Sequence, residues 1–145
     1  MVSLQKIANQ HADAVLKHTA LSRTDVAKMI EDSDAKHFDG RYFEMYAVMS
    51  GKSVVGLISL FERSASAVSI GPEIFAEYRK RGYAAEAMQA AMDLAKSRGY
   101  RVVLQQVRID NAASIGLHTK LGFETDHAVF QNRKQHDVCF YLKTI

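Results

Sequence analysis

The segment Arg79-Lys80-Arg81-Gly82-Tyr83-Ala84 is a basic, glycine-containing turn between an apolar run and a helical pattern. Read as Arg-x-x-Gly-x-Ala, it places three cations and several unpaired backbone N–H groups at a helix N-terminus. Glycine lets the backbone approach an anion closely, and the start of a helix carries partial positive charge. The segment therefore predicts a pyrophosphate site, although a solvated helix start has the same composition.

A second informative segment reads Asn111-Ala112-Ala113-Ser114-Ile115-Gly116-Leu117-His118-Thr119-Lys120-Leu121-Gly122-Phe123. It resembles the second signature of the GNAT superfamily of acyl-CoA-dependent N-acyltransferases, Asn-x-x-Ser/Ala-x-x-Leu-Tyr-x-Lys-Leu-Gly-Phe. The basic turn resembles the pyrophosphate loop of the same superfamily, Arg/Gln-x-x-Gly-x-Gly/Ala. The resemblance covers Val54 to Phe123 well, and the string from Gly71 to Ala87 is most similar to the branch with ribosomal-protein N-terminal acetyltransferases. That branch also includes enzymes for small amines.

The hydrophobic pattern predicts one α/β domain over residues 1–145, with the order βααβββαβαββ. A meander of strands followed by alternating helices and strands indicates a mixed sheet with helices on both faces, and therefore three layers. The predicted strands are Leu4–Ile7, Tyr42–Met49, Ser53–Phe61, Ala67–Ile74, Val102–Val107 and a closing hairpin of Phe123–Phe130 with His136–Thr144. The predicted helices are Asn9–Lys17, one that starts at a Ser22 cap with an acidic Asp25, Tyr83–Ser97 and Ala112–Leu121.

The GNAT resemblance implies the same order of elements and one further feature, a pair of neighbouring parallel strands that splay apart. Here these strands would be Ala67–Ile74 and Val102–Val107. The pantetheine arm of coenzyme A would lie in the gap. Its amides would pair with the backbone groups that splaying exposes, much as an added strand does.

The resemblance also implies acetyl-CoA as the acyl donor and assigns residues to it. Backbone amides near Ile74 would hold the pantetheine arm and the thioester oxygen. Asn111, together with Ser114, would contact the pantetheine, although asparagine also favours the helix N-cap position. The loop residues would bind the pyrophosphate: Arg79, Lys80, Arg81, Gly82, Tyr83, Ala84 and Ala85.

His118 stands where the family usually has a tyrosine that reaches the thiolate leaving group. A protonated histidine could supply that proton, a neutral one could accept a proton from the amine, or the side chain could simply pack. The glutamates that relatives carry as bases correspond here to Gln106 and Ser69, which are not carboxylates. Glu73 shares a strand face with Ser69 and Gly71, and it is the remaining candidate base; a solvated or cross-strand charge is the alternative.

Acceptor selection would fall to the first helix pair and the strand that begins near Tyr42. Tyr42, Glu44 and Tyr46 share one face of that strand, and Asp39 lies just upstream. A carboxylate among aromatic rings could bind an ammonium ion. The same alternation is ordinary for a half-buried strand.

Composition narrows the function classes. A hydrophobic content of 48% and a charged content of 24% are typical of a soluble globular protein, and the net charge of +3 comes from interspersed charges that do not demand nucleic acid. Cys139, the one cysteine, lies in an apolar run and is expected to be buried, which fits a reducing compartment. We expect a cytoplasmic protein without a membrane segment or a metal; a homodimer is possible.

Three functions remain open at this point. The first is an acetyl-CoA-dependent N-acetyltransferase that acts on a small-molecule amine or a peptide N-terminus. The second is a non-catalytic acyl-CoA-binding or sensor domain, which the absent tyrosine and absent glutamates would suit. The third is a nucleic-acid-binding module, which the basic charge alone suggests and no recognition helix supports.

Overall fold

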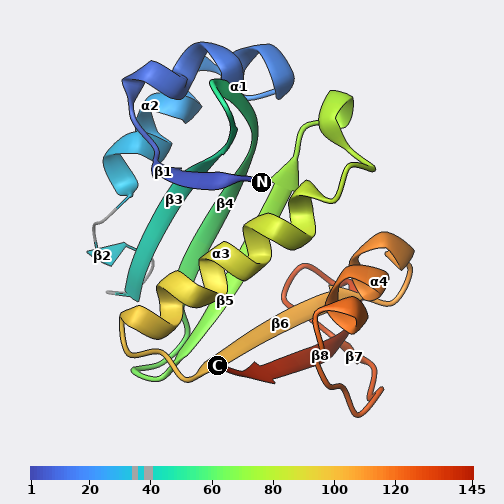
Figure 1. The fold of residues 1–145 in the computed structure, drawn as a ribbon. Helices are drawn as coiled ribbons and strands as arrows, with labels where there is room; N and C mark the ends of the chain where they lie inside the picture. The colour runs from blue at the N-terminus through green and yellow to red at the C-terminus, as the bar shows by residue number, and fades with distance from the viewer. Residues whose placement is uncertain (34–35, 38–40) are drawn as a thin grey trace.

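The computed structural model of this protein describes residues 1–33, 36–37 and 41–145, and Figure 1 shows the arrangement of its elements. The helical elements are η1 (Asn9–His11), α1 (Ala12–His18), α2 (Arg23–Asp32), η2 (Ala76–Tyr78), α3 (Tyr83–Ser97) and α4 (Ala112–Lys120). The strands are β1 (Ser3–Lys6), β2 (Lys36–His37), β3 (Arg41–Ser50), β4 (Ser53–Glu62), β5 (Ala67–Ile74), β6 (Val102–Arg108), β7 (Phe130–Gln131) and β8 (Asp137–Thr144).

The strands form a mixed sheet in the order β1-β3-β4-β5-β6-β8-β7, with β2 also paired to β3. The pairs along this order are antiparallel except for β5 and β6, which run parallel and are connected through α3. The β3–β4 hairpin turns at Gly51, whose φ of 60° lies in the left-handed region that glycine adopts without strain. The predicted mixed sheet is confirmed.

Helices cover both faces of this sheet, as Figure 1 shows, with α3 across one face and α1 and α2 over part of the other. Alternating strand residues divide between the two layers. Val48 of β3 joins the apolar cluster under α3, whereas Ala47 joins the cluster with Val15 of α1 and Val26 of α2. This division gives the predicted three-layer architecture.

Local signals fixed the main helix boundaries. The hydroxyl of Ser22 accepts a hydrogen bond from the Asp25 amide at 3.0 Å, and the Asp25 carboxylate accepts one from the Ser22 amide at 3.0 Å. This reciprocal cap starts α2 as predicted. The bounds of α3 are those that its apolar periodicity predicts, and Gly99, with a φ of 92°, follows its C-terminus.

The prediction of a strand over Phe123–Phe130 was wrong. The structure has an isolated bridge between Glu124 and Leu142 and then a two-residue strand, β7. Between them, side chains take the backbone amides that a strand would use for pairing. The Thr125 hydroxyl accepts a hydrogen bond from the His127 amide at 3.2 Å, and the Asp126 carboxylate accepts one from the Ala128 amide at 2.9 Å. Such local bonds hold the chain in turns and prevent it from joining the ladder.

Two features of the described ranges bear on function. None of the helices there has the length and apolar character needed to cross a membrane. In the same part of the chain, no group of three or more His, Cys, Asp or Glu side chains is arranged to hold a metal ion. Cys139 is a buried free thiol in the core, as the sequence predicts.

Candidate functional site

The parallel strands β5 and β6 separate soon after they begin. Their ladder consists of Ala67 opposite Val102 and Val68 opposite Val103, and no further pair follows in the described chain. At the next position the Ser69 hydroxyl donates to the carbonyl of Leu104 on the opposite strand. Beyond this point none of the described strands pairs with the side of β5 that faces β6, so the splay that the resemblance implies is present.

Gln105 bridges the two strands where they part. Its side-chain carbonyl accepts a hydrogen bond from the Ile70 amide at 2.8 Å, and its side-chain NH₂ donates to the Ile70 carbonyl. Both backbone groups of Ile70 are therefore satisfied by one side chain instead of a neighbouring strand. Gln105 is 5% exposed, which makes these bonds costly to remove.

The same glutamine connects the strands to α4 through His118. The His118 Nδ1 lies 2.7 Å from the carbonyl oxygen of Ser114, which can only accept, so Nδ1 carries the proton. The second hydrogen of the Gln105 NH₂ then points to His118 Nε2 at 3.2 Å. Burial lowers the pKa of His118, and the bond to Ser114 offsets only part of that effect. His118, which is 3% exposed, is therefore neutral at pH 7.

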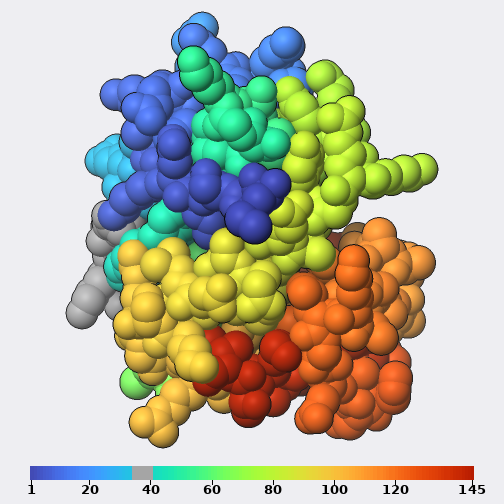
Figure 2. Space-filling view, viewed as in Figure 1, coloured from blue at the N-terminus to red at the C-terminus, as the bar shows by residue number. Residues whose placement is uncertain are grey.

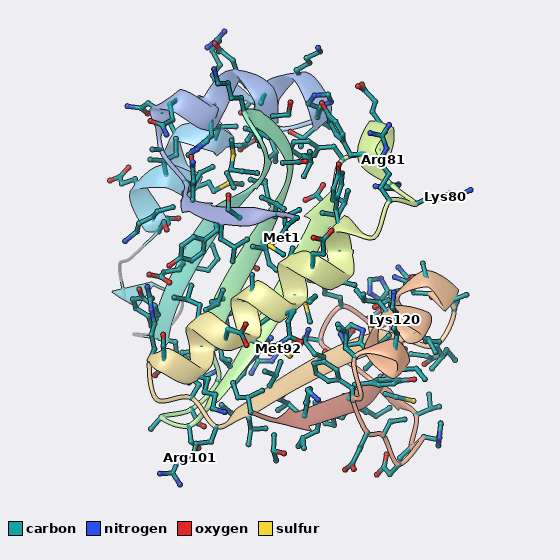
Figure 3. All side chains as sticks on the ribbon, in the orientation of Figure 1. Met1, Lys80, Arg81, Met92, Arg101 and Lys120 are labelled. Carbon is teal, nitrogen blue, oxygen red and sulfur yellow. The ribbon has the colours of Figure 1, made fainter. Side chains whose placement is uncertain are left out.

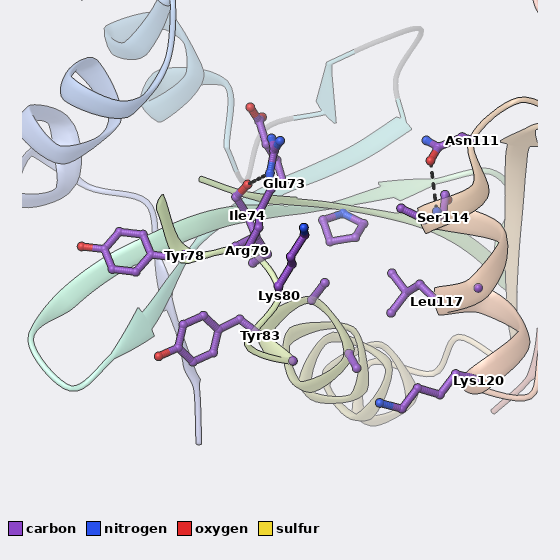
Figure 4. Close-up of a pocket in the computed structure, with 16 residues that line it drawn as sticks. Glu73, Ile74, Tyr78, Arg79, Lys80, Tyr83, Asn111, Ser114, Leu117 and Lys120 are labelled. Carbon is purple, nitrogen blue, oxygen red and sulfur yellow. Dashed lines mark hydrogen bonds between the residues drawn. The ribbon is translucent and has the colours of Figure 1, made fainter. Parts of the chain in front are cut away.

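A cavity of about 760 Å³ opens beyond the point of splay. Its walls are the end of β5 (72–74), the loop and first turn of α3 (78–85) and one face of α4 (111–120). Figure 2 shows the hollow on the molecular surface, between the lime segment that precedes α3 and the orange α4. Figure 4 shows the lining side chains, which come from both of the predicted motifs.

The loop before α3 leaves backbone N–H groups at the cavity. Lys80 and Gly82 have φ values of 64° and 83°, so two left-handed residues, separated by Arg81, turn the chain sharply just before α3. Gly82 is the N-cap of α3 and offers no side-chain acceptor to the first turn. The amides of residues 83–85 therefore remain available to an anion at the positive end of the helix.

Of the three cations of the loop, two line the cavity. Arg79 and Lys80 are lining residues, and Arg79 Nε also donates to the carbonyl of Ile74 at 2.9 Å. Arg81 instead folds back over the Tyr78 ring, 5.7 Å from its centre, and donates to the Glu77 carbonyl at 3.4 Å. Figure 3 shows Lys80 extending outward from the loop.

The opposite wall is α4, whose N-cap is Asn111. The Asn111 side-chain oxygen accepts from the Ser114 amide at 3.0 Å (Figure 4), and its NH₂ group has no hydrogen-bond acceptor among the residues that the structure describes. Leu117 and Lys120 follow on the same helix face and also line the cavity. Sequence reasoning assigned no role to these two, although three-residue steps from Ser114 to Leu117 and from Leu117 to Lys120 make each a neighbour of the one before on the helix surface.

A second cavity, of about 300 Å³, approaches the splay from the sheet face that carries α1 and α2. Ser59, Phe61, Ser69 and Gly71 contribute to its floor, and His118 lies at its inner end. The two cavities share Pro72 and Ser114 as lining residues, so they meet there. We refer to this second cavity as the acceptor groove.

The structure places Glu73, the candidate base, and also Ser69 and Gln106, which stand where relatives carry glutamates, along the walls of these two cavities. Glu73 is exposed at the rim of the larger cavity, on the sheet face shared with Gly71. Ser69 and Gln106 both line the acceptor groove. Gln106 is exposed, and its side-chain oxygen accepts from Asn132 at 3.3 Å.

Of the two interpretations of the Tyr42, Glu44 and Tyr46 face of β3, the structure supports the half-buried strand and not the ammonium site. Glu44 is 1% exposed on the α3 face, and its carboxylate forms an ion pair with Arg98 at the C-terminus of α3. Arg98 also donates to the hydroxyls of Tyr42 and Tyr46, at 2.8 and 2.9 Å. The cation among these aromatic rings is thus the protein's own arginine. Asp39, the other residue of the ammonium interpretation, lies outside the described residues.

Burial raises the pKa of Glu44, but the hydrogen bonds that it accepts from Arg98, Tyr42 and Tyr46 outweigh that effect and leave the pKa lowered. Burial and the same carboxylate raise the pKa values of Tyr42 and Tyr46 to about 12. All three groups therefore hold one charge state across physiological pH. They anchor α3 to the sheet and take no part in the site.

Comparisons with known proteins agree with this geometry. The sequence profile of a family described as an acetyltransferase (GNAT) domain matches residues 3–124. A 48-residue stretch is 40% identical to the L-methionine sulfoximine/L-methionine sulfone acetyltransferase of Pseudomonas paraeruginosa, over 33% of this chain and 28% of that protein. A 50-residue stretch is 36% identical to N-alpha-acetyltransferase 30 of Schizosaccharomyces pombe, over 34% and 33% of the two chains. The matched parts thus span well under two thirds of these relatives.

Solved structures are similar over almost the whole chain. An acetyl transferase from Salmonella typhimurium that modifies the N-terminal serine of ribosomal protein L7/L12 superposes with a TM-score of 0.83 at 22% identity, over 99% of this chain and 95% of that chain. Spermidine N-acetyltransferase from Vibrio cholerae, solved with CoA and spermine, gives a TM-score of 0.80 at 15% identity, over 99% and 95%. At these identities the likeness concerns the fold. The profile match covers most of the sequence, and we conclude that this chain belongs to the GNAT acetyltransferase family.

Proposed function

We propose that this protein moves the acetyl group of acetyl-CoA directly to the primary amine of a small molecule or a peptide N-terminus. The observation that carries the proposal is the pair of cavities that meet at Pro72 and Ser114. They approach the splayed strands from opposite faces of the sheet. A donor and an acceptor can therefore reach one point from two sides, and such positioning accounts for much of the rate of an acyl transfer.

The larger cavity suits acetyl-CoA in three respects. The unpaired amides after Gly82 and the side chains of Arg79 and Lys80 match a pyrophosphate. Lys120 brings a further positive charge from the opposite wall. The free edge of β5 and the NH₂ group of Asn111 can pair with the amides of the pantetheine arm.

Bound acetyl-CoA supplies an acetyl group that is already activated as a thioester. An acceptor nitrogen at the meeting point attacks the thioester carbonyl carbon, so that a C–N bond forms and the C–S bond breaks. We assign Glu73, at the rim, to accept the amine's proton through water, while the departing thiolate takes a proton from solvent.

We assign His118 a positioning role rather than that of an acid. Its Nε2 lone pair already accepts from Gln105, and its Nδ1 proton is donated to the Ser114 carbonyl. A buried histidine with a lowered pKa has no second proton to give at pH 7. Its contacts support the view that it holds α4, and with it Asn111 and Ser114, against the splayed strands.

The test combines calorimetric binding of acetyl-CoA with release of free thiol in the presence of peptides, amino acids and polyamines. We expect binding and release with one class of amine. Lys80→Gln should weaken acetyl-CoA binding about tenfold, as expected for one lost charged contact, whereas Lys96→Gln, an exposed lysine on α3 outside the cavity, should not. Absence of binding would refute the proposal, and binding without release for every amine would support the acyl-CoA sensor instead.

A further inference from the structure

The acceptor groove has a positively charged group at its outer end. Arg63 follows β4 directly and lines the groove together with Ser69. Its Nε donates to the Ser69 hydroxyl at 2.9 Å, and its guanidinium lies 4.7 Å from the centre of the Phe61 ring. These two contacts fix the plane of the guanidinium while leaving its two terminal nitrogens without an acceptor among the described residues. An arginine held in this way is preorganised for a carboxylate.

The charge of Arg63 is not compensated within the part of the chain that the structure describes. None of the ion pairs there involves Arg63, and none of the described groove-lining residues is acidic. Loss of water around the guanidinium, followed by the nearby positive charge of Arg41, lowers the pKa of Arg63, as expected for a cation without a counter-ion. Arginine nevertheless stays charged at physiological pH.

The length of the groove sets the distance between Arg63 and the point near Pro72 where the two cavities meet. At the usual rise of a strand, Ser69 lies about 7 Å from Gly71 and about 10 Å from Pro72, where the two cavities meet. The carboxylate carbon of a free α-amino acid is only about 2.5 Å from its nitrogen, so it is too close to span this distance. An extended peptide advances about 3.3 Å per residue and brings an acidic side chain at its second or third position to Arg63.

We propose that the acceptor is a peptide N-terminus with an acidic residue at the second or third position, whose carboxylate binds Arg63 while its amine lies at Pro72 and Ser114. This inference rests on the proposed function and narrows its acceptor. The group transfer is unchanged: the amine nitrogen gains the acetyl carbon, and the thiolate leaves with the electron pair of the C–S bond. Polyamines are disfavoured, because the groove would set their second ammonium group against Arg63.

The experiment compares matched peptides that have Glu or Gln at the second or third position, with acetyl-CoA as the donor. In the unaltered protein we expect kcat/KM to be about twofold to fivefold higher for a Glu peptide than for its Gln partner, the range typical of one ion pair at an exposed arginine. Arg63→Gln should abolish that preference while leaving the KM for acetyl-CoA unchanged. Arg63→Glu should favour a peptide with Lys at the same position.

Arg101→Gln provides the control, because Arg101 is also an exposed arginine but lines neither cavity. It should keep the preference for Glu. The inference would be overturned if Arg63→Gln lowered kcat/KM equally for Glu and Gln peptides, or if spermidine or a free amino acid were acetylated and no peptide was. In that last case thiol release with the other amine would still uphold the acetyltransferase, so the two proposals fail separately.

Discussion

Gln105→Leu should destabilise the protein more than any other neutral change at the site. The substitution removes the partners of the Ile70 amide, the Ile70 carbonyl and His118 Nε2 together. A buried polar group that loses its partner costs about 1 to 3 kcal/mol, but water from the adjoining acceptor groove can reach some of these groups. We therefore expect the free energy of unfolding to fall by about 2 to 4 kcal/mol.

Gln106→Leu is a matched control. Gln106 is the next residue on β6, but it is exposed on the other face, and within the described part of the chain its side chain forms only one 3.3 Å hydrogen bond, which it accepts from Asn132. Its loss should cost less than about 1 kcal/mol. Urea unfolding of both variants, with the denaturant slope checked for constancy, measures the difference. Equal destabilisation of the two variants would refute the view that Gln105 closes the splay.

Three further outcomes follow from the structure. Arg98→Met should cost about 2 to 4 kcal/mol in urea unfolding, because it removes the nearer counter-ion of the buried Glu44 carboxylate and leaves Lys6, 3.9 Å away. Adding Glu44→Leu should recover part of that loss, and no recovery would argue against the ion pair as the cause. Gly82→Ala and Gly99→Ala should each cost about 1 to 2 kcal/mol of stability, because both place a side chain on a left-handed residue. Only Gly82→Ala should also weaken the binding of acetyl-CoA, measured by calorimetry. Equal affinity of the two variants would contradict an anion site at the start of α3. The pKa values of His11 and His118 are lowered, mainly by burial, so below pH about 6.5 the unfolded chain binds more protons than the folded chain. The denaturant midpoint should therefore be constant above that pH and fall below it. A midpoint that rises on acidification would contradict the view that both histidines are buried in the neutral form.

The sequence predicted those parts of the fold whose signals are local. The Ser22–Asp25 cap and the apolar periodicity of α3 act within one or two helical turns, so they can be recognised without knowledge of the rest of the molecule. The strand over Phe123–Phe130 was mispredicted because the side chains of Thr125 and Asp126 satisfy the backbone locally, and apolar composition does not reveal that competition.

The site was predictable where a motif names its residues and less so where distant segments meet. Alternation correctly placed Tyr42, Glu44 and Tyr46 on one face of β3, but it could not identify the face, nor reveal that Arg98 packs there. Gln105 was missed for a related reason. Its role depends on where β5 and β6 separate, and that is a property of the pairing rather than of either strand alone.

The most direct test of the central claim is to follow an isotopically labelled acetyl group from acetyl-CoA. The protein would be mixed with labelled acetyl-CoA and a peptide that has glutamate at the second position, and peptide, protein and free thiol would be quantified together by mass spectrometry and a thiol reagent. We predict one label on the peptide's N-terminal nitrogen for each thiol released, and none left on the protein. Label that stays on the protein, or thiol release without labelled peptide, would contradict direct transfer to an amine at the meeting point of the two cavities.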